Sequence, residues 1–188
     1  MKVALYGGSF DPPHAGHVLA AAYLTCIAGF ERVLVVPVYG HAFDKHPAPF
    51  EHRIRLCQLA FAGLGAVEVS AIESELEAPS YTISTVRALL SRHQDWQLRV
   101  VVGADVLPEI ERWHESDELQ RLAPLFVLGR SGWRDGRAPI PLLPEVSSSQ
   151  IRAWLAQPPS EQRDSRLQEV MPARVLEAIR HWGLYRGA

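Results

Sequence analysis

The chain has 188 residues, of which 47% are hydrophobic and 21% are charged, and its formal net charge at pH 7 is -2. This length suits one α/β domain with a small helical appendage, and no stretch approaches the roughly 18 uninterrupted apolar residues of a membrane-spanning helix. Proteins that bind nucleic-acid backbones usually carry a clear basic excess, so the charge argues against a broad nucleic-acid surface. Any phosphate site must therefore be local.

The N-terminal segment predicts a strand that runs straight into a glycine turn. Residues 3–6 are apolar, and Gly7 and Gly8 follow them, which is typical of a first strand rather than a secretory signal. We therefore expect a cytoplasmic protein with no membrane segment. Cys26 and Cys57 lie in apolar helical patterns, which predict buried thiols rather than a disulfide or a nucleophile.

Short apolar runs then alternate with longer segments of helical period. The expected strands are 3–6, 33–38, 66–72, 98–102 and 125–128, and the expected helices between them are 18–30, 50–64 and 82–92. This alternation indicates an α/β fold, a Rossmann-like doubly wound parallel sheet with helices on both faces. Ligands of such sheets bind beyond the carboxyl ends of the strands, so we expect the site in the loops after Tyr6, Val38, Ile72 and Val102.

The C-terminal part, from about residue 147, is expected to be helical. Helices are predicted over 150–155 and 173–182, and a loop is predicted over 158–165 because this stretch is polar and begins with two prolines. We expect residues 1–188 to form a single domain that ends in these helices. The pattern does not specify an oligomeric state, and a homo-oligomer is compatible with it.

The loop after the first expected strand, GGSFDPPHAGH over 7–17, is the most informative stretch of the chain. It matches neither the dinucleotide motif G-x-G-x-x-G nor the P-loop. Its paired glycines let backbone amides approach a phosphate, and Gly16 precedes an apolar helix whose first N–H groups would face an anion. His14 and His17 can both donate to one phosphate. Either histidine alone could be a cap or a surface residue, but the pair in this loop favours phosphate binding.

The element His14-Ala15-Gly16-His17 resembles the H-x-G-H signature of the nucleotidyltransferase superfamily. The preceding G-G-S-F-D-P-P is similar to the narrower group of nicotinate and nicotinamide mononucleotide adenylyltransferases. The resemblance implies that His14 and His17 are catalytic. It also implies that the loop before them binds ATP, through Gly7, Gly8, Ser9 and Phe10.

A second element, V-S-S-S-Q-I-R over 146–152, resembles the family's I-S-S-T-x-I-R. Ser147 followed by Gln150 is a capping-box pattern, so Ser148 and Ser149 would open a helix with hydroxyls and amides directed outward. Arg152 on the first turn would add donors for a triphosphate. Alone, this element would be an ordinary helix cap. Together with the loop over 7–17, called the histidine loop below, it predicts ATP binding by Ser148, Ser149 and Arg152.

Further elements fit the same resemblance. Gly103 and Asp105 end a strand and are expected to hold the adenylate half, since a carboxylate there can accept from ribose hydroxyls. Nicotinate mononucleotide is expected to contact Trp113 by stacking and the helix start by charge. The mononucleotide residues are Lys45, Tyr81, Thr82, Thr85 and Trp113. His41, His46 and His52 are irregularly spaced and are expected to be solvated loop histidines rather than metal ligands.

The resemblance extends to Leu128-Gly129-Arg130 and to the closing Gly183-Leu184-Tyr185, so it covers nearly the whole chain. It implies transfer of AMP from ATP to nicotinate mononucleotide, giving nicotinate adenine dinucleotide and pyrophosphate in NAD biosynthesis. Mg2+ is expected on substrate phosphates and water, with Asp11 only a weak ligand candidate.

Two alternatives stay open. One is an adenylyltransferase for nicotinamide mononucleotide or another phosphate monoester. The other, of a different class, is a non-catalytic dinucleotide-binding regulator. A regulator would be marked by loss of a reactive residue, and His14, His17 and Arg152 are all present.

Overall fold

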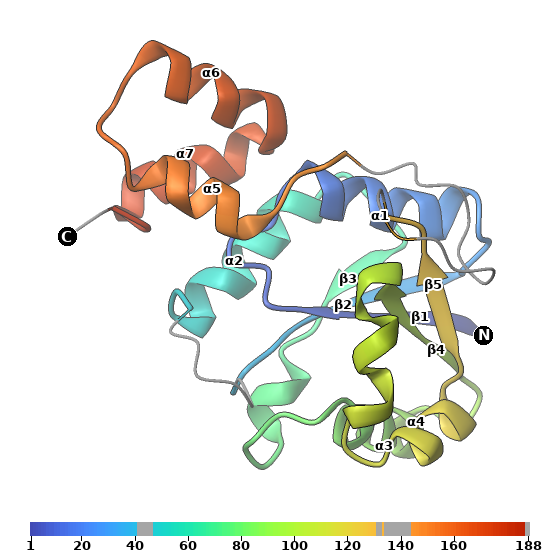
Figure 1. Cartoon of the computed structure of the whole chain (residues 1–188). Coiled ribbons are helices and arrows are strands. Elements are labelled where there is room, and N and C mark those ends of the chain that lie inside the picture. The colour runs from blue at the N-terminus through green and yellow to red at the C-terminus, as the bar shows by residue number, and fades with distance from the viewer. Residues whose placement is uncertain (41–46, 131–132, 134–143, 187–188) are drawn as a thin grey trace.

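Five parallel strands form one sheet in the order β3-β2-β1-β4-β5 in the computed structural model, which describes residues 1–40, 47–130, 133 and 144–186 (Figure 1). The strands are β1 (Lys2–Gly8), β2 (Arg32–Pro37), β3 (Val67–Val69), β4 (Gln97–Gly103) and β5 (Leu125–Leu128). The helices are α1 (Ala15–Cys26), α2 (Phe50–Phe61), η1 (Ile72–Glu75), α3 (Thr82–Arg92), η2 (Ala104–Arg112), α4 (Ser116–Leu122), α5 (Ser148–Leu155), α6 (Glu161–Val170) and α7 (Ala173–Trp182), where η marks a 3-10 helix. The expected α/β fold is confirmed.

The strand order reverses beside β1. The chain builds outward from β1 to β2 and β3, then returns to place β4 on the other side of β1, with Leu5 paired with both Leu34 and Val100. At such a switch point the loops that follow the two central strands leave in opposite directions and open a crevice. The loop after β1 and the turn after β4 are therefore the two that flank this crevice.

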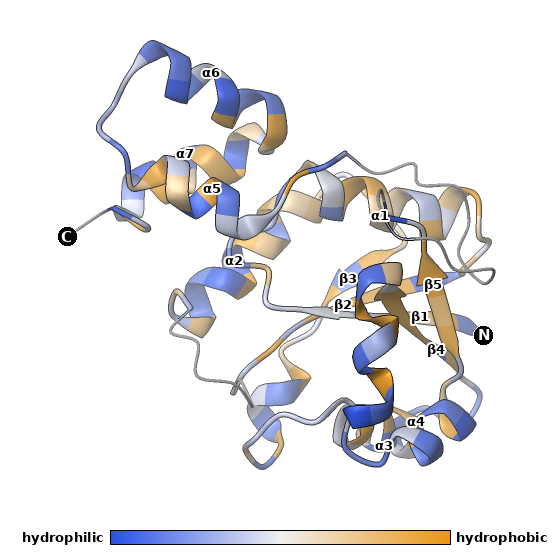
Figure 2. Cartoon of the chain, in the orientation of Figure 1, coloured by the Kyte–Doolittle hydropathy of each residue, from blue (hydrophilic) through white to orange (hydrophobic). Residues whose placement is uncertain are grey.

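Helices cover both faces of the sheet, as Figure 1 shows. Val3 and Leu5 of β1 face a core completed by α3 and α4, whereas Ala4 between them faces a core completed by α1 and α2. This follows from the two-residue period of a strand. Figure 2 shows the consequence, with apolar central strands and helices that are polar on their outer sides.

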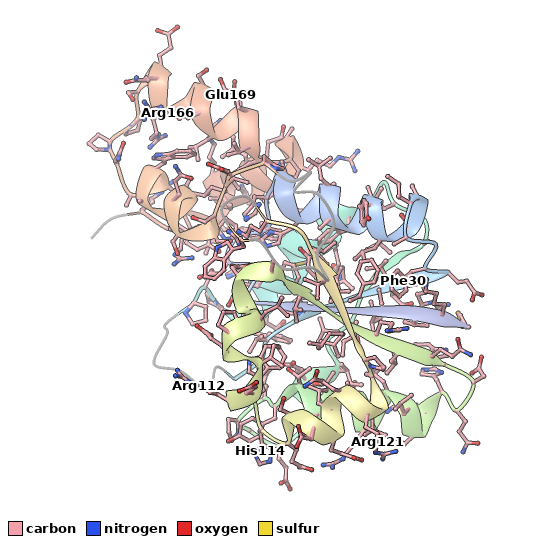
Figure 3. All side chains as sticks on the ribbon, turned by 45° about the vertical axis from the view of Figure 1, so that its right-hand side comes forward. Phe30, Arg112, His114, Arg121, Arg166 and Glu169 are labelled. Carbon is pink, nitrogen blue, oxygen red and sulfur yellow. The ribbon has the colours of Figure 1, made fainter. Side chains whose placement is uncertain are left out.

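The C-terminal helices α5, α6 and α7 pack on the side of α2 away from the sheet. Leu56 of α2 joins a third apolar cluster with Ile151, Leu167 and Ile179, one from each of these helices. Arg166 and Glu169 of α6 point away from that cluster (Figure 3). None of the helices in the part of the chain that the structure describes has the length and apolar character to cross a membrane.

The expected loop over 158–165 is wrong, because α6 begins within it. Ser160 caps this helix by accepting a hydrogen bond from the Arg163 amide, and only Leu167 of the helix is buried. A helix with so narrow an apolar side shows little helical period in its sequence. The two short helices η2 and α4 were likewise not expected.

Several expected boundaries also shift. The first helix ends at Cys26 rather than continuing to Phe30, because Gly29 adopts a left-handed φ of 69°. The strand expected over 66–72 stops early, since the Ser70 hydroxyl accepts from the Ile72 amide and turns the chain into η1. Cys57 is buried as expected, but Cys26, the last residue of α1, is exposed.

Candidate active site

A cleft of about 640 Å³ lies beyond the carboxyl ends of β1 and β4, at the switch point. Segments far apart in the sequence line it: the loop after β1, the turn after β4, the residues after β5 and the start of α5. Most of the residues expected to be catalytic or to bind ATP are among them: Ser9, Phe10, His14, His17, Gly103, Asp105, Ser148, Ser149 and Arg152. The structure thus brings the two main motifs to one cleft.

His14 and His17 form a stacked pair at the start of α1. Their ring centroids are 3.8 Å apart, and the His14 backbone amide donates to His17 Nδ1 at 3.2 Å. Because Nδ1 of His17 accepts, the ring proton belongs on Nε2, which becomes a donor. A Cβ on Gly16 would lie 3.1 Å from two atoms of the His14 ring, so glycine leaves the room that this ring occupies.

Both histidines are neutral at pH 7. Burial, followed by the nearby Arg130 charge, lowers the pKa of His14 to about 4. Burial, His14 and Arg130, in that order, lower the pKa of His17 well below its ordinary value. His14 Nδ1 is also buried without a hydrogen-bond partner among the described residues. A pair of neutral imidazoles can donate to an anion without repelling the neighbouring cation.

Phe10 supports this pair from beneath. It is 2% exposed, and its ring centroid is 4.9 Å from that of His17 and 5.4 Å from that of Tyr6. A Cβ on Gly8 would lie 3.2 Å from the Phe10 ring, so the second glycine makes space for it. Gly7 and Gly8 belong to the end of β1 and do not line the cleft.

Asp11 fastens the histidine loop to the C-terminal part. Its Oδ1 accepts from the Tyr185 hydroxyl at 2.6 Å and from the Ala48 amide at 3.1 Å. Arg152 donates to the Asp11 carbonyl at 2.6 Å and to the Ser149 hydroxyl at 3.2 Å. Burial and the Asp11 carboxylate raise the pKa of Tyr185. Asp11, the weak candidate for a metal ligand, therefore already has a structural role.

The start of α5 is capped as its sequence predicts. Ser147 accepts a hydrogen bond from the Gln150 amide at 3.2 Å. The Ser148 hydroxyl donates to the Pro12 carbonyl at 2.9 Å, which ties this helix start to the histidine loop. The two motifs are therefore in direct contact.

Asp105 and Arg130 form an ion pair in the lining of the cleft. Arg130 Nη1 lies 2.8 Å from Asp105 Oδ2, while Asp105 Oδ1 is buried and unpaired within the described part of the chain. A Cβ on Gly103 would collide with the Asp105 carboxylate, so glycine leaves room for the observed position of that carboxylate. Arg130 was not expected as a site residue, although the rule that ligands bind beyond strand ends, applied to the fifth strand, would have identified it.

Of the residues expected to contact the mononucleotide, the four that the structure describes, Tyr81, Thr82, Thr85 and Trp113, lie outside the lining of this cleft. Tyr81 precedes α3 and stacks on His114, with centroids 4.3 Å apart, and Trp113 packs half-buried against the α3 side of the core. Arg112 and His114 mark this end of η2 in Figure 3. Thr82 opens α3, whereas Thr85 is 2% exposed and donates to Glu73 at 3.4 Å.

The remaining expectations concern residues near the second strand. Lys45, His41 and His46 lie outside the described residues. His52 was expected to be a solvated loop histidine, and this is wrong: it belongs to α2, and its ring lies 4.9 Å from that of Trp182 with Nδ1 buried. The contact with Trp182, the last residue of α7, partly buries it.

Comparison with known proteins places the chain in a family. The Cytidylyltransferase-like family model matches residues 5–154. The protein named "Probable nicotinate-nucleotide adenylyltransferase" of Anaeromyxobacter dehalogenans (strain 2CP-1 / ATCC BAA-258) is 38% identical over 192 residues, which cover 99% of this chain and 97% of that protein. This chain belongs to the nicotinate-nucleotide adenylyltransferase family. The protein of the same name from Myxococcus xanthus (strain DK1622) is 35% identical over 98% of this adenylyltransferase and 95% of its own length.

Solved structures share the fold of this adenylyltransferase. The Plasmodium falciparum nicotinic acid mononucleotide adenylyltransferase complexed with NaAD superposes with a TM-score of 0.83 over 98% of this chain and 97% of that one, at 18% identity. The same protein complexed with APC gives a TM-score of 0.80, at 17% identity and with 98% and 96% covered. The resemblance stated from the sequence is confirmed, and the chain is a nucleotidyltransferase.

Proposed function

We propose that this adenylyltransferase transfers AMP from ATP to nicotinate mononucleotide, producing nicotinate adenine dinucleotide and pyrophosphate in NAD biosynthesis. The observation that carries the proposal is the contact between the histidine loop and the start of α5 at one cleft, in a chain of this family. The 5'-phosphate of the mononucleotide attacks the α-phosphorus of ATP in line, and the bond to pyrophosphate breaks. No covalent enzyme intermediate is required.

The protein's task in this reaction is alignment and charge stabilisation. The nucleophile is already an anion, so no general base is needed at the attacking oxygen. His17 Nε2–H and the His14 ring donate to oxygens of the transferring phosphorus. Arg152 and Arg130 both line the cleft, and their guanidinium groups are suited to the triphosphate.

The adenylate half is assigned to the turn after β4. Asp105 Oδ1 is a buried acceptor beside the cleft and suits a ribose hydroxyl. The absence of a side chain at Gly103 keeps that carboxylate in place. The backbone at Ser9 and Phe10, which line the cleft, is assigned to the α-phosphate, and Gly7 and Gly8 support it from the end of β1.

Enzymes of this family that act on ATP use a divalent metal ion, and we propose that this ion is Mg2+. Within the residues that the structure describes, no group of three His, Cys, Asp or Glu side chains is placed to bind a metal. The Asp11 carboxylate is engaged by Tyr185 and Ala48. Substrate phosphates and water are therefore the fitting ligands, and the ion would offset charge on the leaving pyrophosphate.

Nicotinate is assigned to the start of α3. No side chain in the described ranges caps this helix, so its first amides and the Thr82 hydroxyl are suited to a carboxylate. Trp113 supplies an aromatic face for the pyridine ring. Thr85 is assigned an indirect part in this site, through its hydrogen bond to Glu73. Lys45 remains assigned to the mononucleotide by the family resemblance.

ATP and nicotinate mononucleotide are the proposed partners, and the cytoplasm is the proposed location. We assign no nucleic-acid or membrane partner. A homo-oligomer is compatible with the proposal.

The test is pyrophosphate release from ATP with a panel of nicotinate mononucleotide, nicotinamide mononucleotide and other phosphate monoesters. A helix start binds a carboxylate by charge-assisted bonds that an amide lacks, so we expect catalytic efficiency to favour the acid roughly tenfold to a hundredfold. Trp113→Ala lowers both efficiencies and preserves their ratio, whereas Thr82→Val erodes the ratio.

Each other outcome of this panel selects an alternative. Equal efficiency for acid and amide removes the nicotinate assignment and leaves the adenylyltransferase standing. Release with a different phosphate monoester alone replaces the substrate. Dinucleotide binding without release from any substrate favours a non-catalytic regulator.

A further inference from the structure

Glu73 is a buried carboxylate that the proposed chemistry does not use. It lies in η1, directly after β3, and is 7% exposed, whereas its neighbours Ser74 and Glu75 on the same short helix are exposed. It does not line the cleft at the switch point. A charged side chain is rarely buried unless several donors satisfy it.

Two segments supply those donors. The Tyr39 amide, after β2, donates to Glu73 Oε2 at 2.9 Å, and the Thr85 hydroxyl of α3 donates to Oε1 at 3.4 Å. The nearby Ser80 hydroxyl acts to lower the pKa of the carboxyl group. Ser80 is itself paired with Gly40, whose amide donates to the Ser80 hydroxyl at 3.1 Å and whose carbonyl accepts from the Ser80 amide at 3.2 Å. Glu73 thus joins the loop after β2 to the segment that opens α3.

The energetics indicate that Glu73 fixes the arrangement of the segments around it more than it stabilises the fold. Burial raises the pKa of Glu73, while the bonds from Tyr39, Ser80 and Thr85 and the charge of Arg53 act in the opposite direction. A buried carboxylate of this kind contributes little net stability compared with an apolar side chain of similar volume. It does specify which three segments meet, because removing it leaves several donors unsatisfied.

The segments that Glu73 joins surround the proposed nicotinate site. Tyr81 and Thr82 lie between Ser80, which pairs with Gly40 of the loop after β2, and Thr85, which donates to Glu73. We propose that Glu73 is a positioning residue for the mononucleotide: it fixes the start of α3 against the loop after β2, so that the first amides of α3 are oriented for the nicotinate carboxylate. This inference rests on the proposed function, which supplies the nicotinate assignment.

The test compares Glu73→Ala and Glu73→Gln in the full chain, with each substrate varied in turn. We expect Glu73→Ala to raise KM for nicotinate mononucleotide roughly tenfold or more, while KM for ATP stays within about twofold. Glutamine keeps an acceptor for Tyr39 and an amide for the hydroxyls, so Glu73→Gln is expected to recover KM to within about threefold of the unmodified enzyme. Glu75→Gln is the matched control, because Glu75 is exposed and pairs only with Arg92 among the described residues; it leaves both KM values unchanged.

Amide hydrogen exchange without substrate gives a second measurement that does not depend on activity. Faster exchange is expected in Glu73→Ala at Tyr39, Gly40 and the first turn of α3, and not in the histidine loop. If Glu73→Ala does not fold, Ser80→Ala carries the test, since it removes the hydroxyl that accepts from the Gly40 amide and acts on the pKa of Glu73. It is expected to raise KM for the mononucleotide about threefold to tenfold and to speed exchange at Gly40.

The outcomes separate the two proposals. Unchanged exchange in the folded variants overturns the positioning role of Glu73. An equal rise in KM for ATP and for the mononucleotide overturns its assignment to the nicotinate side. If the unmodified enzyme does not use nicotinate mononucleotide, the proposed function fails, and the exchange measurement alone decides whether Glu73 positions α3.

Discussion

At the scale of single residues, His17 combines burial with a defined donor. Its Nδ1 accepts from the His14 amide, so its Nε2–H is free to donate to the transferring phosphorus. We expect His17→Ala to lower turnover by roughly two to four orders of magnitude, as when an oriented transition-state donor is removed, and His14→Ala to behave similarly. Steady-state pyrophosphate release measures this. Near-normal turnover in a variant with an unchanged circular dichroism spectrum would reject the phosphate role.

The same histidines should make stability depend on pH. The folded pKa of His14 is about 4, below its ordinary 6.5, so the unfolded chain takes up a proton that the folded chain does not. Stability is then fully present above about pH 6.5 and falls as the pH drops toward 4, by up to about 1.4 kcal/mol per pH unit for each such group. His17 acts in the same direction.

Urea unfolding between pH 7 and pH 5 measures this fall. His14→Gln should show a shallower fall, because it removes one of the two groups. His181→Gln is the control, because His181 is exposed on α7 and does not line the cleft, and it should keep the full slope. A His14→Gln protein with the full slope would contradict the pKa assignment.

What sequence reasoning could predict at this scale depends on whether a residue belongs to a local motif. His14, Gly16 and His17 are three residues of one turn, so their meeting follows from helix geometry. Arg130 and Glu73 gain their roles from partners far along the chain, at Asp105 and at Tyr39 and Thr85. No local spacing encodes those contacts.

At the scale of elements, α5 is a capped helix whose first turn meets the histidine loop. Arg152 donates to the Asp11 carbonyl in that loop, and its guanidinium lines the cleft. We expect Arg152→Ala to raise KM for ATP about tenfold or more, and KM for nicotinate mononucleotide much less, because the donors lost face the triphosphate. Titrating each substrate at saturation of the other separates the effects.

Arg174→Ala, on α7, is the control for this variant, since Arg174 is exposed and is not among the residues that line the cleft. If Arg152→Ala changed only KM for nicotinate mononucleotide, α5 would contact the mononucleotide and not ATP. An effect on both substrates alike would assign Arg152 to holding the loop through Asp11 instead.

Helices and strands could be predicted from the sequence where burial produces a recognisable pattern of apolar residues. The strands β1 and β2 contain continuous buried apolar runs, as does the second half of β4 from Val100 to Val102, and α3 has buried residues at helical spacing. The helix α6 buries only Leu167 and η2 contains Pro108, so neither shows a recognisable helical pattern.

At the scale of the whole molecule, the order of the strands places the cleft. Strand positions along the chain do not reveal that β4 returns beside β1, because that order depends on long-range pairing. Because β1 and β4 are neighbours, the histidine loop and Asp105 both line the cleft that opens beyond these two strands. The start of α5 also lines it. The two motifs could thus be recognised from the sequence, but the sequence did not reveal that they lie close together in space.

The most distant of these contacts joins the two ends of the chain. The Tyr185 hydroxyl donates to Asp11 across 174 residues, and Asp11 is 5% exposed. Tyr185→Phe removes this bond without changing the packing of the ring. We expect the free energy of unfolding to fall by about 1 to 3 kcal/mol, because a buried carboxylate loses a donor, and turnover to fall several-fold as the histidine loop loosens.

Urea unfolding and steady-state kinetics on the same preparation measure the two effects of Tyr185→Phe, and Tyr23→Phe is the matched control because its hydroxyl, on α1, lies outside the Asp11 cluster. Only coupling between the C-terminal part and the histidine loop makes both quantities change together, since Tyr185 does not line the cleft and touches no substrate there. A stability loss with unchanged turnover would show that Arg152 and the Ala48 amide hold Asp11 without help, and that the C-terminal part stabilises the fold but does not order the loop.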